Sequence, residues 1–192
     1  MPRSRSPRLK SHRLFFPAAC LYAAVALPLS MVSMLTGWSA APGLAGSHHG
    51  HEMIFGFALA VVAGYTLGPQ PARWLSALFG LWLAARLGYT LAPDLWLSQL
   101  LSPAFTLLLA WRVVPRFNAA KKWRNRMLVP LMVSLCGLPL LWLILPIIPV
   151  PGATTLLHTG VALLLLLMTF MSGRLIAPAV AGTLEKRGIT QE

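Results

Sequence analysis

This chain of 192 residues is 57% hydrophobic and only 10% charged, whereas soluble domains carry about 25% charged residues. Its net charge of +12 would suit a nucleic-acid partner if the basic residues formed one solvated face, but they fall in the gaps between apolar runs. The composition therefore excludes a soluble domain and a nucleic-acid-binding protein, and it indicates a protein whose partner is the lipid bilayer.

The apolar residues form six long runs. Each is close to the roughly 20 residues that an α-helix needs to cross about 30 Å of hydrocarbon. The first run is longer than the core of a signal peptide, so we expect it to remain as a transmembrane helix. The sequence predicts an all-α integral membrane protein with a basic tail (1–13), a bundle of six transmembrane helices within 14–177 (runs 14–35, 52–69, 72–91, 95–114, 127–148 and 153–177) and a polar tail (178–192).

Lys and Arg residues are concentrated in alternate connections between these runs. Cytoplasmic loops of membrane proteins carry an excess of Lys and Arg, so we expect both termini to be cytoplasmic. The connection that follows the first run is then external. The base-rich set is 1–13, Arg73, 112–126 and 178–192, and the base-free set is 36–51, 89–95 and 149–157.

The stretch Ser47–Met53 holds three of the five histidines, His48, His49 and His51, and one of the four acidic residues, Glu52. Imidazole is the commonest metal ligand in proteins and titrates near neutrality. Ionisable residues at a transmembrane helix are costly and usually functional. This stretch is therefore the first candidate for a binding site.

Two conformations of the stretch are open. If the helix begins before His48, then His48, His51 and Glu52 share one face, three and four residues apart. If the stretch is extended, His49 and His51 point the same way. Either arrangement could place two imidazoles on one ion or one imidazole on a haem iron. A solvated external linker is the plainer alternative.

Two further polar residues are expected at the same membrane depth, Arg86 in the third run and His158 in the sixth. We expect His51 and His158 to reach a common ligand, with Arg86 and Glu52 close by. Glu52 would be a ligand, would orient an imidazole, or would be the counter-ion of Arg86. The alternatives are a His158 that bonds to a neighbouring helix and an Arg86 that extends its charge to the interface.

Small residues recur at every fourth position of the second and third runs. This spacing places them on one helix face, where a neighbouring backbone can approach closely. We expect these two helices to be neighbours, or one of the two faces to form a subunit contact. The small residues are Gly56, Ala60, Gly64 and Gly68 in the second run and Gly80, Ala84 and Gly88 in the third.

The sequence resembles the NnrS family, membrane proteins described as containing haem and copper and linked to nitric oxide stress. The resemblance covers nearly the whole chain and follows the N-terminal half of longer family members. It implies a bacterial inner-membrane location. On this resemblance, His49, His51, Glu52, Arg86 and Arg174 match motif positions. The matching segments are His49–Ala58 with Ala63-Gly64, Leu81–Arg86, Arg124–Met127 and Ser172–Ile176.

The leading hypothesis is a half-length NnrS-like protein that binds haem or copper near the outer membrane face. It would support nitric oxide tolerance or respiratory metalloproteins. His49, His51 and His158 would be the ligands, with Glu52 and Arg86 beside them. No nucleophile triad, phosphate loop or dinucleotide motif indicates catalysis. A metal-delivery or transport protein and a non-catalytic scaffold subunit are the alternatives, and a homodimer or another membrane protein could replace the missing half.

Overall fold

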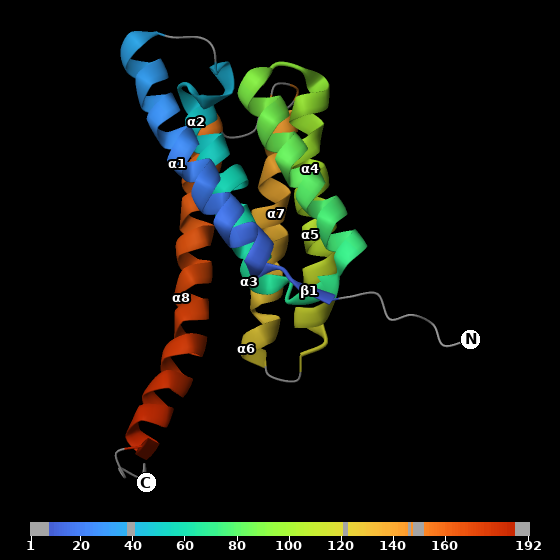
Figure 1. Ribbon diagram of the computed structural model, residues 1–192, viewed down its shortest axis with the longest axis vertical. Coiled ribbons are helices and arrows are strands. Elements are labelled where there is room, and N and C mark those ends of the chain that lie inside the picture. The colour runs from blue at the N-terminus through green and yellow to red at the C-terminus, as the bar shows by residue number, and fades with distance from the viewer. Residues whose placement is uncertain (1–7, 38–40, 121–122, 146, 148–151, 187–192) are drawn as a thin grey trace, which may run out of the picture.

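The computed structural model describes residues 8–37, 41–120, 123–145, 147 and 152–186, and these form a bundle of helices (Figure 1). The prediction of an all-α fold is confirmed, apart from one short pair of strands. The elements in chain order are β1 (Arg8–Lys10), α1 (His12–Thr36), η1 (Pro42–Leu44), α2 (Ser47–His51), η2 (Glu52–Ala58), α3 (Leu59–Thr66), β2 (Pro69–Pro71), α4 (Ala72–Leu91), α5 (Trp96–Asn118), α6 (Trp123–Arg126), α7 (Leu128–Ile144) and α8 (Ala153–Lys186).

The long helices run side by side along the bundle and alternate in direction (Figure 1). The elements α2, η2 and α3 follow one another without a break and together act as one helical segment. Helix α1 packs against α3, α5 packs between α4 and α7, and α8 packs against α7. The alternation brings β1, α6 and the C-terminal end of α8 toward the lower end of the view.

Among the described residues, three helices are long and apolar enough to cross a membrane: His12–Thr36, Trp96–Asn118 and the Ala153–Gly173 part of α8. Helix α7 is apolar but shorter. Large apolar side chains also cover the outside of the bundle, including Leu35 and Trp96, which are 80% and 67% exposed. Apolar surface on this scale suits contact with lipid rather than with water, so the chain is a membrane protein.

The second helical segment departs from the expected α-helix, because its middle section, η2, is a π-helix. A π-helical section is rare, and it often occurs at functional sites. The last helix also differs from the expectation, since α8 continues to Lys186 rather than ending at 177. The helix therefore continues through Pro178 and Gly182, two residue types that disfavour a helix interior.

The strands β1 and β2 form a small antiparallel ladder that the sequence analysis did not predict. Arg8 pairs with Pro71 and Lys10 with Pro69. Gly68, with φ +60°, makes the turn from α3 into β2, a conformation that glycine adopts without a steric cost. The ladder ties the start of the chain to the connection between α3 and α4.

A separate set of polar contacts holds that connection. Ser11 donates from Oγ to the carbonyl oxygen of Gly64 at 2.8 Å, and Gln70 donates to that of Leu67 at 2.6 Å. Arg112 reaches Gln70 Oε1 at 3.2 Å. These contacts satisfy backbone groups that the helix end leaves unpaired.

Candidate functional site

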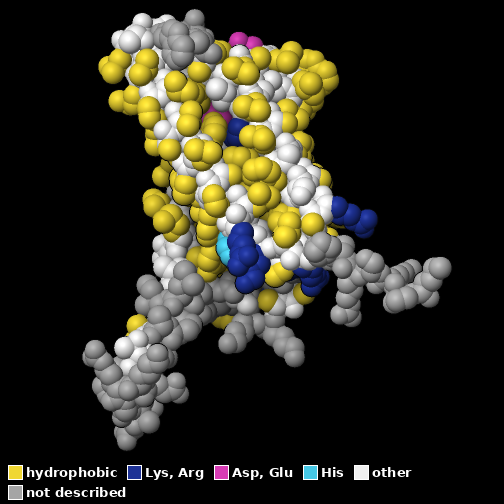
Figure 2. All heavy atoms as spheres, viewed as in Figure 1, with side chains coloured by type: hydrophobic (Ala, Val, Ile, Leu, Met, Phe, Trp, Pro, Cys, Tyr) yellow, Lys and Arg dark blue, Asp and Glu magenta, His cyan; other side chains and the backbone are white. Residues whose placement is uncertain are grey.

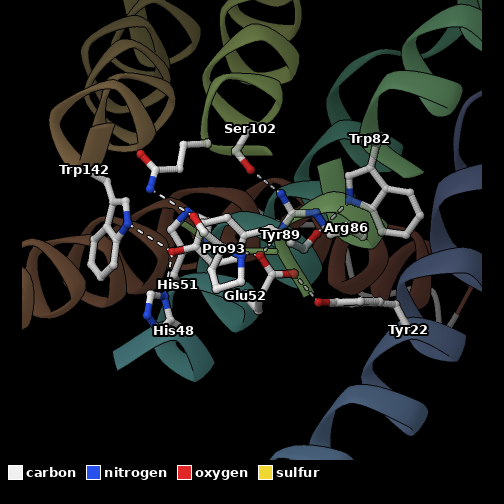
Figure 3. A network of polar contacts seen from close by, with 12 residues as sticks. Tyr22, His48, His51, Glu52, Trp82, Arg86, Tyr89, Pro93, Ser102 and Trp142 are labelled. Carbon is white, nitrogen blue, oxygen red and sulfur yellow. Dashed lines mark hydrogen bonds and ion pairs between the residues drawn. The ribbon is translucent and has the colours of Figure 1, made fainter. Parts of the chain in front are cut away.

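The carboxylate of Glu52 is the centre of a polar network inside the bundle (Figure 3). Glu52 is fully buried. Its Oε1 accepts a hydrogen bond from Arg86 Nη1 at 2.6 Å and lies 3.1 Å from His51 Nδ1. Its Oε2 accepts a hydrogen bond from the hydroxyl of Tyr22. Side chains from α1, α2 and α4 therefore meet at one carboxylate.

Arg86 is buried as deeply as its partner, with only 1% of the side chain exposed. Its Nη2 donates to the hydroxyl of Ser102 on α5. The alternative that Arg86 extends its charge to the interface is therefore wrong, and the interpretation of Glu52 as its counter-ion holds. Two opposite charges in contact avoid the large cost of leaving either one alone in a medium of low dielectric.

The absence of a side chain at Gly56 leaves room for the guanidinium of Arg86 against η2. Gly56 lies in η2, and a Cβ atom at this position would stand 2.6 Å from Arg86 Nη1. The carbonyl oxygen of Gly56 accepts a hydrogen bond from Trp82 Nε1 at 2.9 Å. Trp82 and Arg86, one turn apart on α4, thus both dock on the same turn of the neighbouring helix.

His51 is 2% exposed and is held by aromatic rings as well as by Glu52. Its ring stacks on Tyr89, with a centroid separation of 3.9 Å and an interplanar angle of 12°. Phe55 lies edge-on to it, and Trp142 of α7 lies 5.1 Å away. Because a carboxylate only accepts, His51 donates from Nδ1 and keeps a lone pair on Nε2.

The hydroxyl of Tyr89 joins His48 to the rest of the bundle. His48 Nδ1 lies 2.9 Å from this oxygen, which also accepts a hydrogen bond from Trp142 Nε1 at 3.1 Å. The helix begins at Ser47, so His48, His51 and Glu52 follow the helical one of the two predicted arrangements. Their shared face is turned into the protein, toward α4 and α7.

The remaining predicted residues lie apart from this network. His49 is half-buried, and its Nδ1 is buried without a hydrogen-bond partner. His158 is exposed on α8 and makes none of the contacts described above. Its assignment as a ligand shared with His51 stays a prediction. Arg174 belongs to α8, but its side chain lies outside the described residues.

Three glycines of the two patterns, Gly56, Gly64 and Gly88, pack closely against other helices, whereas a Cβ at Gly68 or Gly80 would meet nothing within 4 Å. Gly64 of the second segment faces Phe15 and Phe16 of α1, and Gly88 of α4 faces Ser98 of α5. Only Gly56 mediates contact between the second segment and α4. The two helices are neighbours at the polar network, and their glycines serve the helices on either side.

Five residues of the network were missed by the sequence analysis. Ser102 and Tyr89 are polar residues inside apolar runs, and that signal could have found them. The other aromatic residues of the network gave no such signal, because tyrosine and tryptophan also occur at membrane interfaces for other reasons. The missed residues are Tyr22, Trp82, Tyr89, Ser102 and Trp142.

The donor atoms suit individual haem or copper ligands but do not complete a site within the described residues. His51 has the geometry usual for a ligating histidine, since a carboxylate holds the ring nitrogen that would not bind metal. His49 offers a buried, unpartnered ring nitrogen. Nowhere in the described part of the chain do three His, Cys, Asp or Glu residues gather as a metal site. A third ligand would have to come from elsewhere.

Comparison with known proteins identifies the family. The family model described as NnrS protein matches residues 9–192. No curated protein and no solved structure matches the chain. The family match begins at β1 and includes the whole of the polar network around Glu52. Because it covers nearly the full length, the chain belongs to the NnrS family.

Proposed function

We propose that this NnrS-family protein spans a bacterial inner membrane six times and binds haem or copper near the outer face. In this role it supports nitric oxide tolerance or the function of respiratory metalloproteins. In support, the interior of the bundle brings an imidazole, a carboxylate and a guanidinium together.

The arrangement of basic residues supports the six-span topology. The long segments alternate in direction along the bundle (Figure 1). On the face shown in Figure 2, most basic side chains lie near the lower end, and acidic ones are visible at the upper end. Basic residues favour the cytoplasmic side, so the lower end, toward which β1 and the C-terminal end of α8 lie, is the cytoplasmic end. The polar network then lies in the outer half of the membrane.

The single observation that carries the proposal is the buried contact among His51, Glu52 and Arg86. Ionisable side chains in the membrane interior are rare, and they usually mark a functional site. Here the carboxylate holds the imidazole and the guanidinium at the same oxygen atom, Oε1. A ligand histidine needs such support, because its orientation fixes the lone pair that meets the metal.

His51 is the proposed ligand that Glu52 orients, and Arg86 is the counter-ion or an anion-binding group. His49 is also a proposed ligand, but the stretch is helical rather than extended, so its ring lies about 200° around the helix from that of His51. His158 remains a predicted ligand. The imidazoles of one chain fall short of a complete coordination sphere, so a second copy of this chain or another membrane protein would supply the rest. This is the reason to expect a homodimer or a heteromeric complex.

A continuous transport pathway has less support. Between the network at Ser102 and the polar contacts at Arg112, helix α5 buries Phe105 and Leu109, both without exposed surface, and one polar residue, Thr106. The hydroxyl of Thr106 is engaged by the carbonyl oxygens of Pro103 and Cys136, so an ion on this route would meet few polar groups over about three helical turns. Metal delivery at the outer face does not require such a route and stays an alternative.

The test is an absorption spectrum and a copper analysis of the protein purified from its native membrane. The proposal predicts a Soret band or bound copper that falls strongly in His49→Ala and His51→Ala. His12→Ala is the matched control, because His12 is exposed at the start of α1. Wild-type protein free of both haem and copper would refute the proposal.

Size measurement in nanodiscs tests the partner. Protein that keeps its full cofactor content should have the mass of a dimer or of a complex with a second membrane protein. A monomer with full cofactor content and no co-purifying partner would show that this chain completes the site alone.

A further inference from the structure

Three arginines meet at the end of the bundle that carries β1. Arg112 and Arg116 lie four residues apart near the end of α5, a spacing at which like charges face each other and destabilise a helix. Arg8 of β1 adds a third charge, and the charge of Arg116 is repelled by those of both Arg112 and Arg8. We call these three residues the arginine cluster.

The connection between α3 and α4 holds the arginine cluster together. Basic residues that only mark the cytoplasmic side need not converge, since the side of the membrane is all that matters for topology. Here, however, Arg8 lies in β1, which pairs with β2. Arg112 donates from Nε to Oε1 of Gln70 in β2 at 3.2 Å, and Arg116 donates to the carbonyl oxygen of Leu67. The fold therefore brings three like charges to one connection.

No carboxylate of the described residues balances this charge. Every ion pair formed among them belongs to Glu52. Asp94 lies before α5, at the opposite end of that helix, and Glu185 belongs to the last turn of α8, which ends well away from β1 (Figure 1). On the face shown in Figure 2, acidic side chains are visible only in the upper half. The positive potential of the arginine cluster therefore favours a bound anion.

Arg112 is the member of the cluster best placed to bind an anion. Its Cζ lies 5.2 Å from the ring centre of Trp74, and its Nε is held by Gln70. No residue in the described part of the chain accepts a hydrogen bond from Nη1 or Nη2 of Arg112. A guanidinium with free amino groups can bind two oxygen atoms of one phosphate. Because Arg112 is half-buried, water and salt screen such a contact less than one at an exposed charge.

The arginine cluster lies at the depth of the lipid headgroups. Trp111, the neighbour of Arg112 in sequence, is 66% exposed on α5, and exposed tryptophan is typical of the headgroup level. Leu108, one turn before Arg112 on the same helix face, is 40% exposed. A molecule at this place would therefore meet positive charge at the headgroup level and an apolar helix surface deeper in the membrane.

We propose that the arginine cluster binds the phosphate group of an anionic phospholipid in the cytoplasmic leaflet. The phosphate oxygens accept hydrogen bonds from Arg112, Arg8 and Arg116 add attraction, and an acyl chain lies along α5. Basic sites of this kind between transmembrane helices bind anionic headgroups. Phosphatidylcholine binds less well, because its own ammonium group offsets the phosphate charge. The choice of leaflet rests on the proposed topology, whereas the arginine cluster is separate from the histidines.

Titration of the purified protein in detergent micelles with phosphatidylglycerol that carries a pyrene-labelled acyl chain tests this proposal. Energy transfer from tryptophan to pyrene is the readout, because Trp74 lies beside Arg112. The wild type should show saturable transfer that unlabelled phosphatidylglycerol reverses and phosphatidylcholine reverses poorly. Arg112→Gln, Arg116→Gln and Arg8→Gln should each weaken binding about five-fold, since each removes one charge that attracts the headgroup.

Two control variants separate the arginine cluster from general effects. Arg126→Gln removes the same charge from an exposed position of α6 and should bind phosphatidylglycerol as the wild type does. Arg116→Lys keeps the charge and should retain most of the affinity, which a purely structural role of Arg116 would not predict. Wild-type affinity in all three cluster variants, or an equal loss in Arg126→Gln, would overturn the proposal. Melting temperatures show that each variant is folded.

Competition with salts distinguishes a lipid phosphate from a soluble one. Sodium phosphate and sodium chloride at the same ionic strength should displace the labelled lipid equally, because both act only by screening charge. Stronger displacement by inorganic phosphate would assign the arginine cluster to a soluble phosphate and overturn the lipid proposal. Copper and haem contents of the same preparations show independently whether the histidine site is intact, so failure of one proposal is distinguishable from failure of the other.

Discussion

Glu52 and Arg86 are 34 residues apart in sequence and form an ion pair of 2.6 Å, with 0% and 1% of their side chains exposed. Each charge also has a second type of partner: Tyr22 and His51 for the carboxylate, and Ser102 for the guanidinium. A buried pair contributes little net stability, but breaking it leaves one charge uncompensated. This asymmetry gives the first prediction.

Glu52→Gln and Arg86→Leu should each lower the free energy of unfolding by about 3–5 kcal/mol, because each leaves the opposite charge buried alone. The double variant should be destabilised less than the sum of the two. A double-mutant cycle from denaturant unfolding in detergent micelles measures this coupling. Arg73→Ala, at an exposed position at the start of α4, is the control, and strictly additive effects would contradict direct pairing.

Gly56→Ala should destabilise the protein by about 1–3 kcal/mol, although alanine favours helix, because the added methyl group overpacks the site. The new Cβ would stand 2.6 Å from Arg86 Nη1. The matched control is Gly80→Ala, where a Cβ would meet nothing within 4 Å. That change should stabilise by up to about 1 kcal/mol. Thermal unfolding of the two variants compares them directly, and equal melting temperatures would contradict the packing described for η2.

Tyr89→Phe keeps the ring that stacks on His51 but removes the hydroxyl that meets His48 and Trp142. Loss of these contacts should cost about 1–3 kcal/mol, since Trp142 Nε1 loses its acceptor. Thermal unfolding is again the measurement. Tyr65→Phe, at a side chain that is 42% exposed, should change stability by less than about 0.5 kcal/mol. If Tyr89→Phe leaves the melting temperature unchanged, the hydroxyl does not link α2, α4 and α7.

The topology predicts that alkaline phosphatase fused after Gly46 is active and that fusion after Ala119 gives an inactive enzyme. The reason is the alternation of base-free and base-rich connections. Fusions after Ala92 and Gly68 extend the test to the next pair of connections, with activity expected only for Ala92. The reverse pattern of activities would show that the bundle has the opposite orientation in the membrane.

The sequence alone determined the class of protein and the location of the charged residues. Runs of apolar residues without charge can be stable only in lipid or in a large core, and their length predicts helices. The sequence allowed two conformations of the stretch that holds His48, His51 and Glu52, one helical and one extended, and did not choose between them. The family resemblance was confirmed by the match over residues 9–192.

The tertiary structure decided which of these residues meet. Depth in the membrane placed His158 beside His51, but depth says nothing about rotation around a helix axis, and the side chain of His158 faces outward. The π-helix at Gly56 also has no clear sequence signal, and Arg86 and Trp82, which contact it from α4, lie far away in the sequence. Two partners of Glu52, Tyr22 and Arg86, come from distant parts of the chain, and the third is its sequence neighbour His51. Which distant side chains surround a buried carboxylate is set by how whole helices pack, and local sequence does not contain that information.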